Sequence, residues 1–253
     1  MDNVRLPEKW ERILGSDSEN SKFNLSDFYL KIEGLVAENE SSIIPRPDLI
    51  YNVFRKVEPQ NVKVVLYGED PYPRRTSANG VAFWDEEVVC WESKTSGNSL
   101  RNIIKALLIH KGWASYETPV TECRGIIRDK KVASPPEFFE NWLSQGILLL
   151  NTSLTLSVDE NRKMKKHFSQ WREFQFEVLK GLHSCGQKPW FILWGNKAQA
   201  LKPMITDVFG SEYEKIIEGE HPTFQYQFLR KSGGDKHYSP FTEIIDKTGL
   251  SWL

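Results

Sequence analysis

The chain has 253 residues, of which 40% are hydrophobic and 12% aromatic, so it can bury the core of one large α/β domain. Its formal net charge is −1 at pH 7, which gives no global signal for nucleic-acid binding but leaves a local basic face open. The three cysteines are too scattered for a CxxC metal site and too few for a four-thiolate cluster, so we expect reduced thiols in an intracellular protein. The N-terminus has no apolar signal core and no run reaches membrane-spanning length, so we expect no membrane association.

The N-terminal part is expected to be helical. Residues 1–24 are mostly polar and predict a peripheral arm with one short helical stripe. That stripe consists of Leu6, Trp10, Ile13 and Leu14. Further helices are predicted from residue 24 onward and over 47–57, where apolar residues recur on one face.

Four short apolar runs follow, and each ends in a polar cluster. They cover residues 62–67, 147–150, 190–194 and 215–218. Short apolar runs that alternate with helical periods are typical of a parallel sheet covered by helices. We therefore predict an α/β fold with a central, mainly parallel four-stranded sheet and helices on both faces. One domain is expected to span 1–253, with 1–60 as its N-terminal helical part and 61–253 as its core.

The segments between and after these runs are mostly predicted as helices. They are 100–108, 138–143, 168–182, 196–208 and 241–248, and Asn98 or Ser99 is expected to cap the first. Residues 80–84 and 88–91 are predicted as short extended pieces. Residues 113–136 form a long connection, and such connections are usually functional loops or insertions.

Polar side chains follow three of the apolar runs directly. Asp70 and Tyr72 come after the first run, Asn151 after the second and His221 after the fourth. In parallel sheets ligands bind beyond the carboxyl ends of the strands, so we expect these side chains to share one cleft. A carboxylate, an aromatic ring, an amide and an imidazole together suit a reaction on a polar planar substrate.

Each of these residues also has an ordinary explanation. Asp70 forms an Asp-Pro turn, or it orients a water and stabilises a developing cation. Asn151 caps a strand end, or its amide reads the edge of a base or imide. His221 is a structural loop residue, or it donates a hydrogen bond to a developing oxyanion. Phe83 packs in the core, or it stacks on a planar ring.

Basic residues cluster close to the ends of two of the runs. Arg162, Lys163, Lys165 and Lys166 follow the second run, and Arg74 and Arg75 follow the first. A charge run is usually a solvated face. Because both clusters lie on the side where the strands end, a rim that contacts phosphates is the alternative.

The order and spacing of these signals resemble the family 1 uracil-DNA glycosylases. The matching segments are GEDPYP at 68–73, ANGVAF at 78–83, NSLRN at 98–102, LLLNTSLT at 148–155, FILWGNKAQ at 191–199 and EHPT at 220–223. They resemble the family's GQDPYH, A-x-G-L-A-F, P-S-L-x-N, L-L-L-N-T-x-L-T, F-x-L-W-G-x-x-A-Q and H-P-S motifs. The matches run from about residue 62 to the C-terminus.

The resemblance implies a role in base chemistry for five of the residues. Asp70 would position the hydrolytic water and stabilise the sugar cation. His221 would stabilise the negative charge on uracil O2. Phe83 would stack on the uracil, Asn151 would read its imide edge, and Tyr72 would crowd the site of a 5-methyl group and so reject thymine.

The resemblance also implies contacts with the pocket wall and with DNA. The backbone of Glu69 would line the uracil pocket. Ser99 and Thr223 would hold phosphates, and Lys166 belongs to the basic rim. The family's leucine wedge is missing, and Phe224 or Tyr226 is left as the side chain that fills the emptied base stack.

The chain departs from the family pattern at several positions. Glu69 replaces a glutamine and Pro73 a histidine in the first motif, and Gly97-Asn98 stands where prolines usually precede the serine. An apparent insertion runs from the wedge loop to Gly234, and 113–136 is longer than usual.

The resemblance predicts a monofunctional uracil-DNA glycosylase of base excision repair. It would flip deoxyuridine out of single- or double-stranded DNA, hydrolyse the N-glycosidic bond and leave an abasic site, with no metal or cofactor. We expect a monomer, cytoplasmic in a bacterium and nuclear in a eukaryotic or viral setting. A protein inhibitor or replication partner cannot be read from the sequence.

Two other functions remain open. The changes at Glu69, Pro73 and the wedge loop favour a related glycosylase with an altered base preference, which a panel of modified oligonucleotides would reveal. The unusual loops at 113–136 and 224–236 favour a DNA- or protein-binding platform with secondary catalysis, which would bind tightly without turnover.

Overall fold

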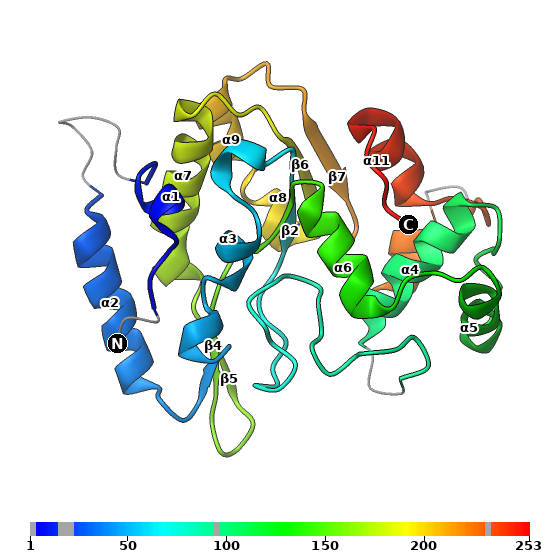
Figure 1. Ribbon diagram of the computed structural model, residues 1–253, viewed down its shortest axis with the longest axis horizontal. Coiled ribbons are helices and arrows are strands. Elements are labelled where there is room, and N and C mark those ends of the chain that lie inside the picture. Colours follow the sequence, from blue (N-terminus) through cyan, green and yellow to red (C-terminus); the bar gives the residue numbers. More distant parts are fainter. Residues whose placement is uncertain (1–3, 15–22, 94–96, 231–233) are drawn as a thin grey trace.

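The computed structural model describes residues 4–14, 23–93, 97–230 and 234–253. Its centre is a parallel four-stranded sheet in the order β3-β2-β6-β7 (Figure 1). The strands are β2 (Val64–Gly68), β3 (Ile147–Asn151), β6 (Trp190–Trp194) and β7 (Ile216–Gly219). Helices α2 (Leu25–Glu38) and α7 (Phe168–Ser184) lie on one side of the sheet, and α4 (Asn98–His110), α6 (Pro135–Ser144) and α11 (Pro240–Thr248) on the other. The predicted α/β fold with a central parallel sheet is therefore confirmed.

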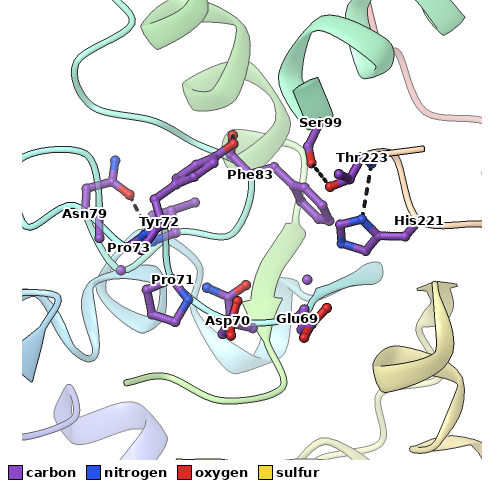
Figure 2. A pocket seen from close by; sticks show the side chains of 15 residues that line it. Glu69, Asp70, Pro71, Tyr72, Pro73, Asn79, Phe83, Ser99, His221 and Thr223 are labelled. Atoms are coloured by element: carbon purple, nitrogen blue, oxygen red, sulfur yellow. Dashed lines mark hydrogen bonds between the residues drawn. The ribbon is translucent and has the colours of Figure 1, made fainter. Parts of the chain in front are cut away.

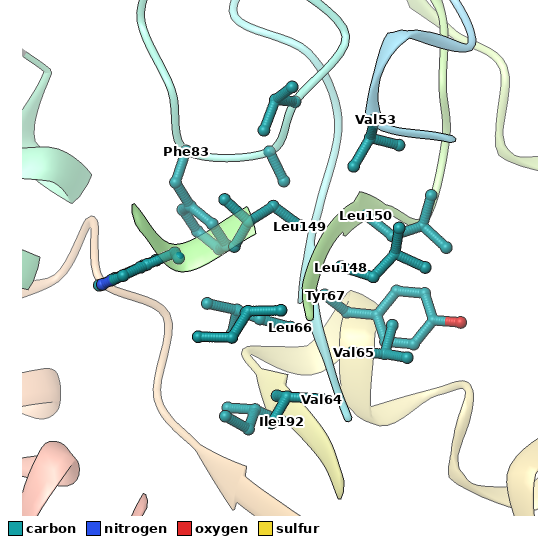
Figure 3. Packing of buried hydrophobic residues seen from close by; sticks show 14 of the residues in the cluster. Val53, Val64, Val65, Leu66, Tyr67, Phe83, Leu148, Leu149, Leu150 and Ile192 are labelled. Atoms are coloured by element: carbon teal, nitrogen blue, oxygen red, sulfur yellow. The ribbon is translucent and has the colours of Figure 1, made fainter. Parts of the chain in front are cut away.

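The apolar runs form strands because the sheet is covered on both faces. All residues of β2 and β3 are buried, so these strands carry no alternation of apolar and polar side chains. Figure 3 shows Leu66 of β2, Leu149 of β3 and Ile192 of β6 within one packed cluster. The carboxyl ends of β2 and β3 are in register, with Gly68 opposite Asn151.

The other helices are short. They are α1 (Glu8–Glu11), α3 (Asn52–Lys56), α5 (Val120–Asp129), α8 (Asn196–Gln199), α9 (Lys202–Phe209) and α10 (Gln225–Leu229), with 3-10 turns at Pro47–Leu49 and Pro59–Asn61. Two helices predicted as continuous are therefore divided, 47–57 into a 3-10 turn and α3, and 196–208 into α8 and α9. Pro203 lies in the first turn of α9, where its missing N–H costs no hydrogen bond and its ring prevents an unbroken helix from residue 196.

The predicted peripheral arm is wrong for its described part. The Trp10 side chain is fully buried, and its Nε1 donates a hydrogen bond to the carbonyl oxygen of Val57 at 2.8 Å. Its ring lies edge-on to Phe54, with 4.9 Å between centroids. Leu6 and Leu14 are buried as well. The polar composition of this segment hid a few apolar side chains that close one end of the core; residues 15–22 lie outside the described residues.

A second sheet was not predicted. It is antiparallel, in the order β1-β4-β5, with β1 (Ile43–Ile44), β4 (Leu156–Val158) and β5 (Met164–Lys166). The β4–β5 hairpin projects at the lower edge of the molecule in Figure 1. These strands have two or three residues each, and β5 is fully exposed and basic, so neither length nor apolar pattern marks them in the sequence.

Three local predictions fail for physical reasons. Residues 80–84 and 88–91 are not strands; within 78–91 the structure has an isolated antiparallel bridge between Ala78 and Asp85, and Phe83 adopts a positive φ of 66° that breaks an extended chain. The long connection 113–136 contains α5, whose Cys123 and Ile127 pack into the core. Neither predicted side chain caps α4, because Asn98 is its first residue and Gly97 holds the cap position.

Candidate active site

A cavity of about 210 Å³ opens at the carboxyl ends of β2 and β3. Its lining comprises Gly68, Glu69, Asp70, Pro71, Tyr72, Pro73, Ala78, Asn79, Gly80, Val81, Phe83, Ser99, Asn151, His221 and Thr223. Figure 2 shows the carboxylates of Glu69 and Asp70 below the Phe83 ring, with the His221 ring beside it. The structure therefore brings together all the residues predicted for base chemistry, and also Ser99 and Thr223. Three predicted residues, Phe224, Tyr226 and Lys166, lie outside this lining.

The turn after β2 holds the two carboxylates. The Glu69 carbonyl oxygen accepts hydrogen bonds from Thr152 Oγ1 at 2.6 Å and from the Ser153 backbone N–H at 3.1 Å, which ties the turn to the end of β3. The Asp70 side chain is only 17% exposed. Burial raises the pKa of Asp70, the nearby Lys166 ammonium group lowers it, and the Glu69 carboxylate raises it further.

Lys166 contacts both carboxylates. Its Nζ donates a hydrogen bond to Glu69 Oε1 at 2.7 Å. The same Nζ lies 2.9 Å from Asp70 Oδ2, an ion pair without hydrogen-bond geometry. Asp70 Oδ2 is buried and has no hydrogen-bond partner among the described residues, so a water or a substrate can reach this carboxylate only at its other oxygen, Oδ1.

Asn151 is positioned by two residues that the sequence analysis missed. A Cβ atom at Gly68 would lie 2.4 Å from Asn151 Oδ1, so only glycine at this position leaves room for the amide. Gln175 of α7 donates from Nε2 to the carbonyl oxygens of Asn151 and Thr152, at 2.8 and 3.2 Å. Gly68 begins the GEDPY segment and was available as a signal, whereas Gln175 lies inside a helix with no local pattern to mark it.

Phe83 sits at the pocket in an unusual backbone conformation. Its φ of 66° is rare for a residue with a side chain and costs about 1–3 kcal/mol. Tyr72 Oη donates a hydrogen bond to the Phe83 carbonyl oxygen at 3.1 Å. The Phe83 ring lies edge-on to the Trp194 ring, with 5.8 Å between centroids. At Gly80, φ is 80° and an added Cβ would meet the Leu49 carbonyl oxygen at 1.8 Å, so this position also requires glycine. These contacts hold the ring at the wall of the cavity.

The hydrogen bonds of His221 define its tautomer. The Thr223 backbone N–H donates to His221 Nδ1 at 3.2 Å, so Nδ1 is an acceptor and the ring proton is on Nε2. Burial lowers the pKa of His221, although the two carboxylates act in the opposite direction. A neutral ring with an Nε2–H donor is therefore the form at neutral pH. Gly195 lets the ring approach, since a Cβ there would lie 2.8 Å from His221 Cβ.

The rim beside His221 carries two hydroxyl groups. Ser99 Oγ and Thr223 Oγ1 are hydrogen-bonded at 2.8 Å (Figure 2). Ser99 lies in the first turn of α4, where free backbone N–H groups favour an anion. Asn102 of the same helix donates from Nδ2 to the Pro222 carbonyl oxygen at 2.6 Å and so fixes the loop that bears His221 and Thr223.

The two candidate wedge residues differ in how they are held. Phe224 is 60% exposed and has no ring contact with any described residue. Tyr226 is 59% exposed, but its ring lies edge-on to Tyr116 at 6.5 Å and beneath the Arg230 guanidinium group at 5.6 Å. Of the pair, Phe224 is the side chain that can move without breaking an aromatic contact.

The basic residues after β2 are partly neutralised. Arg74 Nη2 lies 2.9 Å from Asp85 Oδ2 and 3.3 Å from Glu87 Oε2, so its charge stabilises the loop itself. Among the described residues, no group of three or more His, Cys, Asp or Glu side chains is arranged to hold a metal ion. No described helix is long and apolar enough to cross a membrane.

Comparisons with known proteins agree with this geometry. The family model for the uracil DNA glycosylase superfamily matches residues 54–247. The chain is 30% identical to the uracil-DNA glycosylase of Exiguobacterium sibiricum over 249 residues, which covers 96% of this chain and 97% of that protein. It is 32% identical to the uracil-DNA glycosylase of Bacillus mycoides over 250 residues, which covers 98% of this chain and 95% of that protein.

Solved structures show the same likeness. The crystal structure of the UNG protein from Nitratifractor salsuginis matches with a TM-score of 0.68 and 26% identity, over 97% of this chain and 92% of that one. The mimivirus uracil-DNA glycosylase matches with a TM-score of 0.60 and 22% identity, over 88% of this chain and 73% of that one, a likeness of fold alone.

Proposed function

The chain belongs to the uracil DNA glycosylase superfamily, and we propose that it hydrolyses the N-glycosidic bond of deoxyuridine in DNA, leaving an abasic site in base excision repair. The observation that carries this proposal is the meeting of the Asp70 carboxylate, the Asn151 amide and the His221 imidazole around one small cavity. At about 210 Å³ the cavity is smaller than the roughly 300–1,000 Å³ of sites for drug-sized ligands, which suits a single base. A base can enter it only after leaving the DNA stack.

The chemistry requires charges of opposite sign to be stabilised at two places. As the bond between C1′ and N1 breaks, positive charge develops on the sugar and negative charge on the uracil. The Asp70 carboxylate is assigned to the first charge, and its Oδ1, the oxygen away from Lys166, can accept a proton of the water that attacks C1′. The His221 Nε2–H donates to the second charge at uracil O2. The water oxygen keeps one hydrogen and becomes the hydroxyl on C1′. The proton that Asp70 takes up passes on to the uracil anion, so Asp70 is ionised again at the end.

Base recognition follows from the pocket walls. The Asn151 amide carries both a donor and an acceptor and can pair with the imide edge of uracil. The Phe83 ring provides a stacking surface, and the Glu69 backbone lines the pocket. Tyr72 lines the same cavity and would crowd the 5-methyl group of thymine, so that base would be rejected by steric overlap. Each role assigns a wall of the cavity to one part of uracil.

DNA contacts lie at the rim. Ser99 and Thr223, together with the first turn of α4, present hydroxyl and backbone donors to a phosphate. Phe224, exposed and without ring contacts among the described residues, is the better candidate than Tyr226 for the side chain that fills the vacated base stack. A phosphate contact by Lys166 stays a prediction, because its Nζ is engaged by two carboxylates.

Uracil release from an oligonucleotide with a single uracil tests the function. We expect the wild-type protein to release uracil and to leave a strand that breaks only after alkali. Asp70→Asn and Asn151→Ala should lose at least about 10²-fold in rate, the usual effect of removing one preorganised group. Lys56→Met, which breaks a surface pair with Glu140, is the matched control and should retain full activity. Absence of release by the wild type would refute the proposal.

A second candidate is an altered base preference. It is favoured by Glu69 and Pro73, which both line the cavity and both differ from the family motif. The same assay on thymine mismatches and damaged pyrimidines distinguishes the two. Release of another base at a rate equal to or above that of uracil would replace the first proposal.

A further inference from the structure

Lys166 is held in place by its backbone as well as by its charge. It ends β5 and pairs with Leu156 of β4, a buried residue. The next residue, His167, is fully buried, and its ring contacts the hydroxyl oxygens of Thr155 at 2.9 Å and Ser157 at 3.2 Å. The position of Lys166 is therefore fixed from both sides, unlike that of a lysine on a free loop.

The ammonium group of Lys166 has three neighbours at the turn after β2. Besides Glu69 Oε1 and Asp70 Oδ2, the Phe168 ring lies 5.7 Å away. The Lys166 side chain is 39% exposed, so solvent reaches part of it. Its charged end nevertheless points toward the two carboxylates and not outward. Burial lowers the pKa of Lys166, and the two carboxylates more than offset this, so it stays charged.

The charges that face Asp70 explain why a cation is needed there. They are Glu69 beside it, Lys166 from β5 and His221 from the loop after β7. Because His221 is neutral at neutral pH, Lys166 is the positive charge of this set. Without it, Glu69 and Asp70 would be two neighbouring carboxylates, and like charges disfavour the ionised form of each.

We propose that Lys166 is a positioning residue for catalysis, which pairs with Glu69 through a hydrogen bond and holds Asp70 ionised by its charge beside the buried Oδ2, leaving Oδ1 to the attacking water. Glu69 and Lys166 then form a matched pair: the carboxylate that replaces the family's glutamine anchors the cation that Asp70 requires. This inference deepens the proposed function and rests on it for its catalytic part.

The test is a cycle of variants at the two positions. Single-turnover rates are measured against pH for wild type, Lys166→Met, Glu69→Gln, the double variant and Lys166→Arg. The acid limb of the profile is the pH range in which the rate falls as Asp70 becomes protonated. We expect Lys166→Met to move this limb upward by about one pH unit, the lower end of the effect of an opposite charge at this distance. On the acid side of that limb, where rate follows the ionised fraction, this is a loss of about tenfold.

The double variant separates positioning from simple damage. Adding Glu69→Gln to Lys166→Met removes the uncompensated carboxylate and should return at least half of the shift, while Glu69→Gln alone should leave the limb in place or move it downward. Lys166→Arg keeps the charge and should stay within about half a pH unit of wild type. Lys202→Met, which breaks an exposed pair with Glu218, is the control and should not move the limb.

Two outcomes would overturn the inference. The first is an unchanged limb in Lys166→Met; if DNA binding also weakens and its salt dependence becomes shallower, Lys166 contacts a phosphate instead. The second is a double variant no better than Lys166→Met.

A carbon-13 NMR titration of the Asp70 carboxyl group in DNA-free protein, assigned by its loss in Asp70→Asn, reads the same effect without turnover. An upward shift of the Asp70 titration in Lys166→Met supports the inference even if the wild type releases no uracil, and an unchanged titration overturns it. A failure of the proposed function therefore remains distinguishable from a failure of this inference.

Discussion

The substitution Gly68→Ala should remove activity while leaving the fold intact. An added Cβ would lie 2.4 Å from Asn151 Oδ1 and 3.0 Å from Ala82 Cβ. The first distance is about 1 Å shorter than an ordinary C···O contact of roughly 3.3–3.6 Å. The backbone of Gly68 has no positive φ, so the substitution acts through these two contacts and not through backbone strain. Asn151 must therefore turn its amide away from the uracil position.

The expected cost in stability is moderate because one crowded atom is the end of the Asn151 side chain, whereas the other, Ala82 Cβ, can give way only by a shift of the chain. An off-rotamer Asn151 costs about 0.5–1.5 kcal/mol. The loss of glycine's freedom in the unfolded chain offsets about 0.4–1 kcal/mol of this. The shift at Ala82 adds about 1–3 kcal/mol of overpacking. The net change is about 1–4 kcal/mol, and each kcal/mol lowers Tm by about 2–4 °C in a protein of this size.

The expected cost in activity is large, because the displaced amide is the group assigned to read the base. We expect single-turnover uracil release to fall by about 10²–10³-fold, as for loss of one preorganised donor. Asn151→Ala should show the same loss, and the double variant Gly68→Ala/Asn151→Ala should be no slower than Asn151→Ala alone. A Gly68→Ala protein with near-normal activity, or a double variant much slower than either single one, would refute the reasoning.

Three further predictions address the rest of the molecule. Asp70→Asn should raise Tm at pH 7 by a few degrees while removing activity, because burial raises the pKa of Asp70 and so makes its ionised form destabilising. The gain in Tm should vanish as the pH falls toward 3.8, where the wild-type carboxyl group is protonated. A Tm below that of the wild type at pH 7 would contradict this. Phe224→Ala should slow uracil release from duplex DNA at least about tenfold more than release from single-stranded DNA. Tyr226→Ala is the control and should affect both substrates equally. Equal losses on the two substrates for Phe224→Ala would exclude Phe224 as the wedge. Trp10→Ala should destabilise the protein by about 3–5 kcal/mol in urea unfolding, since the side chain is fully buried and hydrogen-bonded to Val57; a loss under 1 kcal/mol would mean that the N-terminal segment is peripheral after all.

Local sequence was sufficient for the sheet and for the types of residue at the site. Within the runs that became β2 and β3, residues 64–67 and 147–150 do not alternate between apolar and polar, because both faces of the sheet are covered, and that pattern is visible without any tertiary contact. Asn151 ends β3, and Asp70 and His221 lie two residues past the ends of β2 and β7, so parallel topology alone placed them at one edge.

Local sequence failed where a short element depends on its partners. Strand β5 is three exposed residues that pair only with β4, and nothing in their order predicts that pairing. Trp10 belongs to a polar segment and becomes core only because Phe54 and Val57 close over it. In both cases the stabilising contact lies outside the segment, beyond the reach of periodicity.

The sequence by itself therefore determined the sheet, the order of its strands along the chain and the chemical groups at their carboxyl ends, because each depends on neighbouring residues. Tertiary structure alone decided the ion pairs, the hydrogen bonds and the protonation of those groups. The pairing of Glu69 with Lys166 joins residues 97 positions apart, and the Nε2–H tautomer of His221 depends on how its loop turns back on itself. Such contacts depend on register and on the packing of side chains from separate elements, and these are fixed only when the chain has folded.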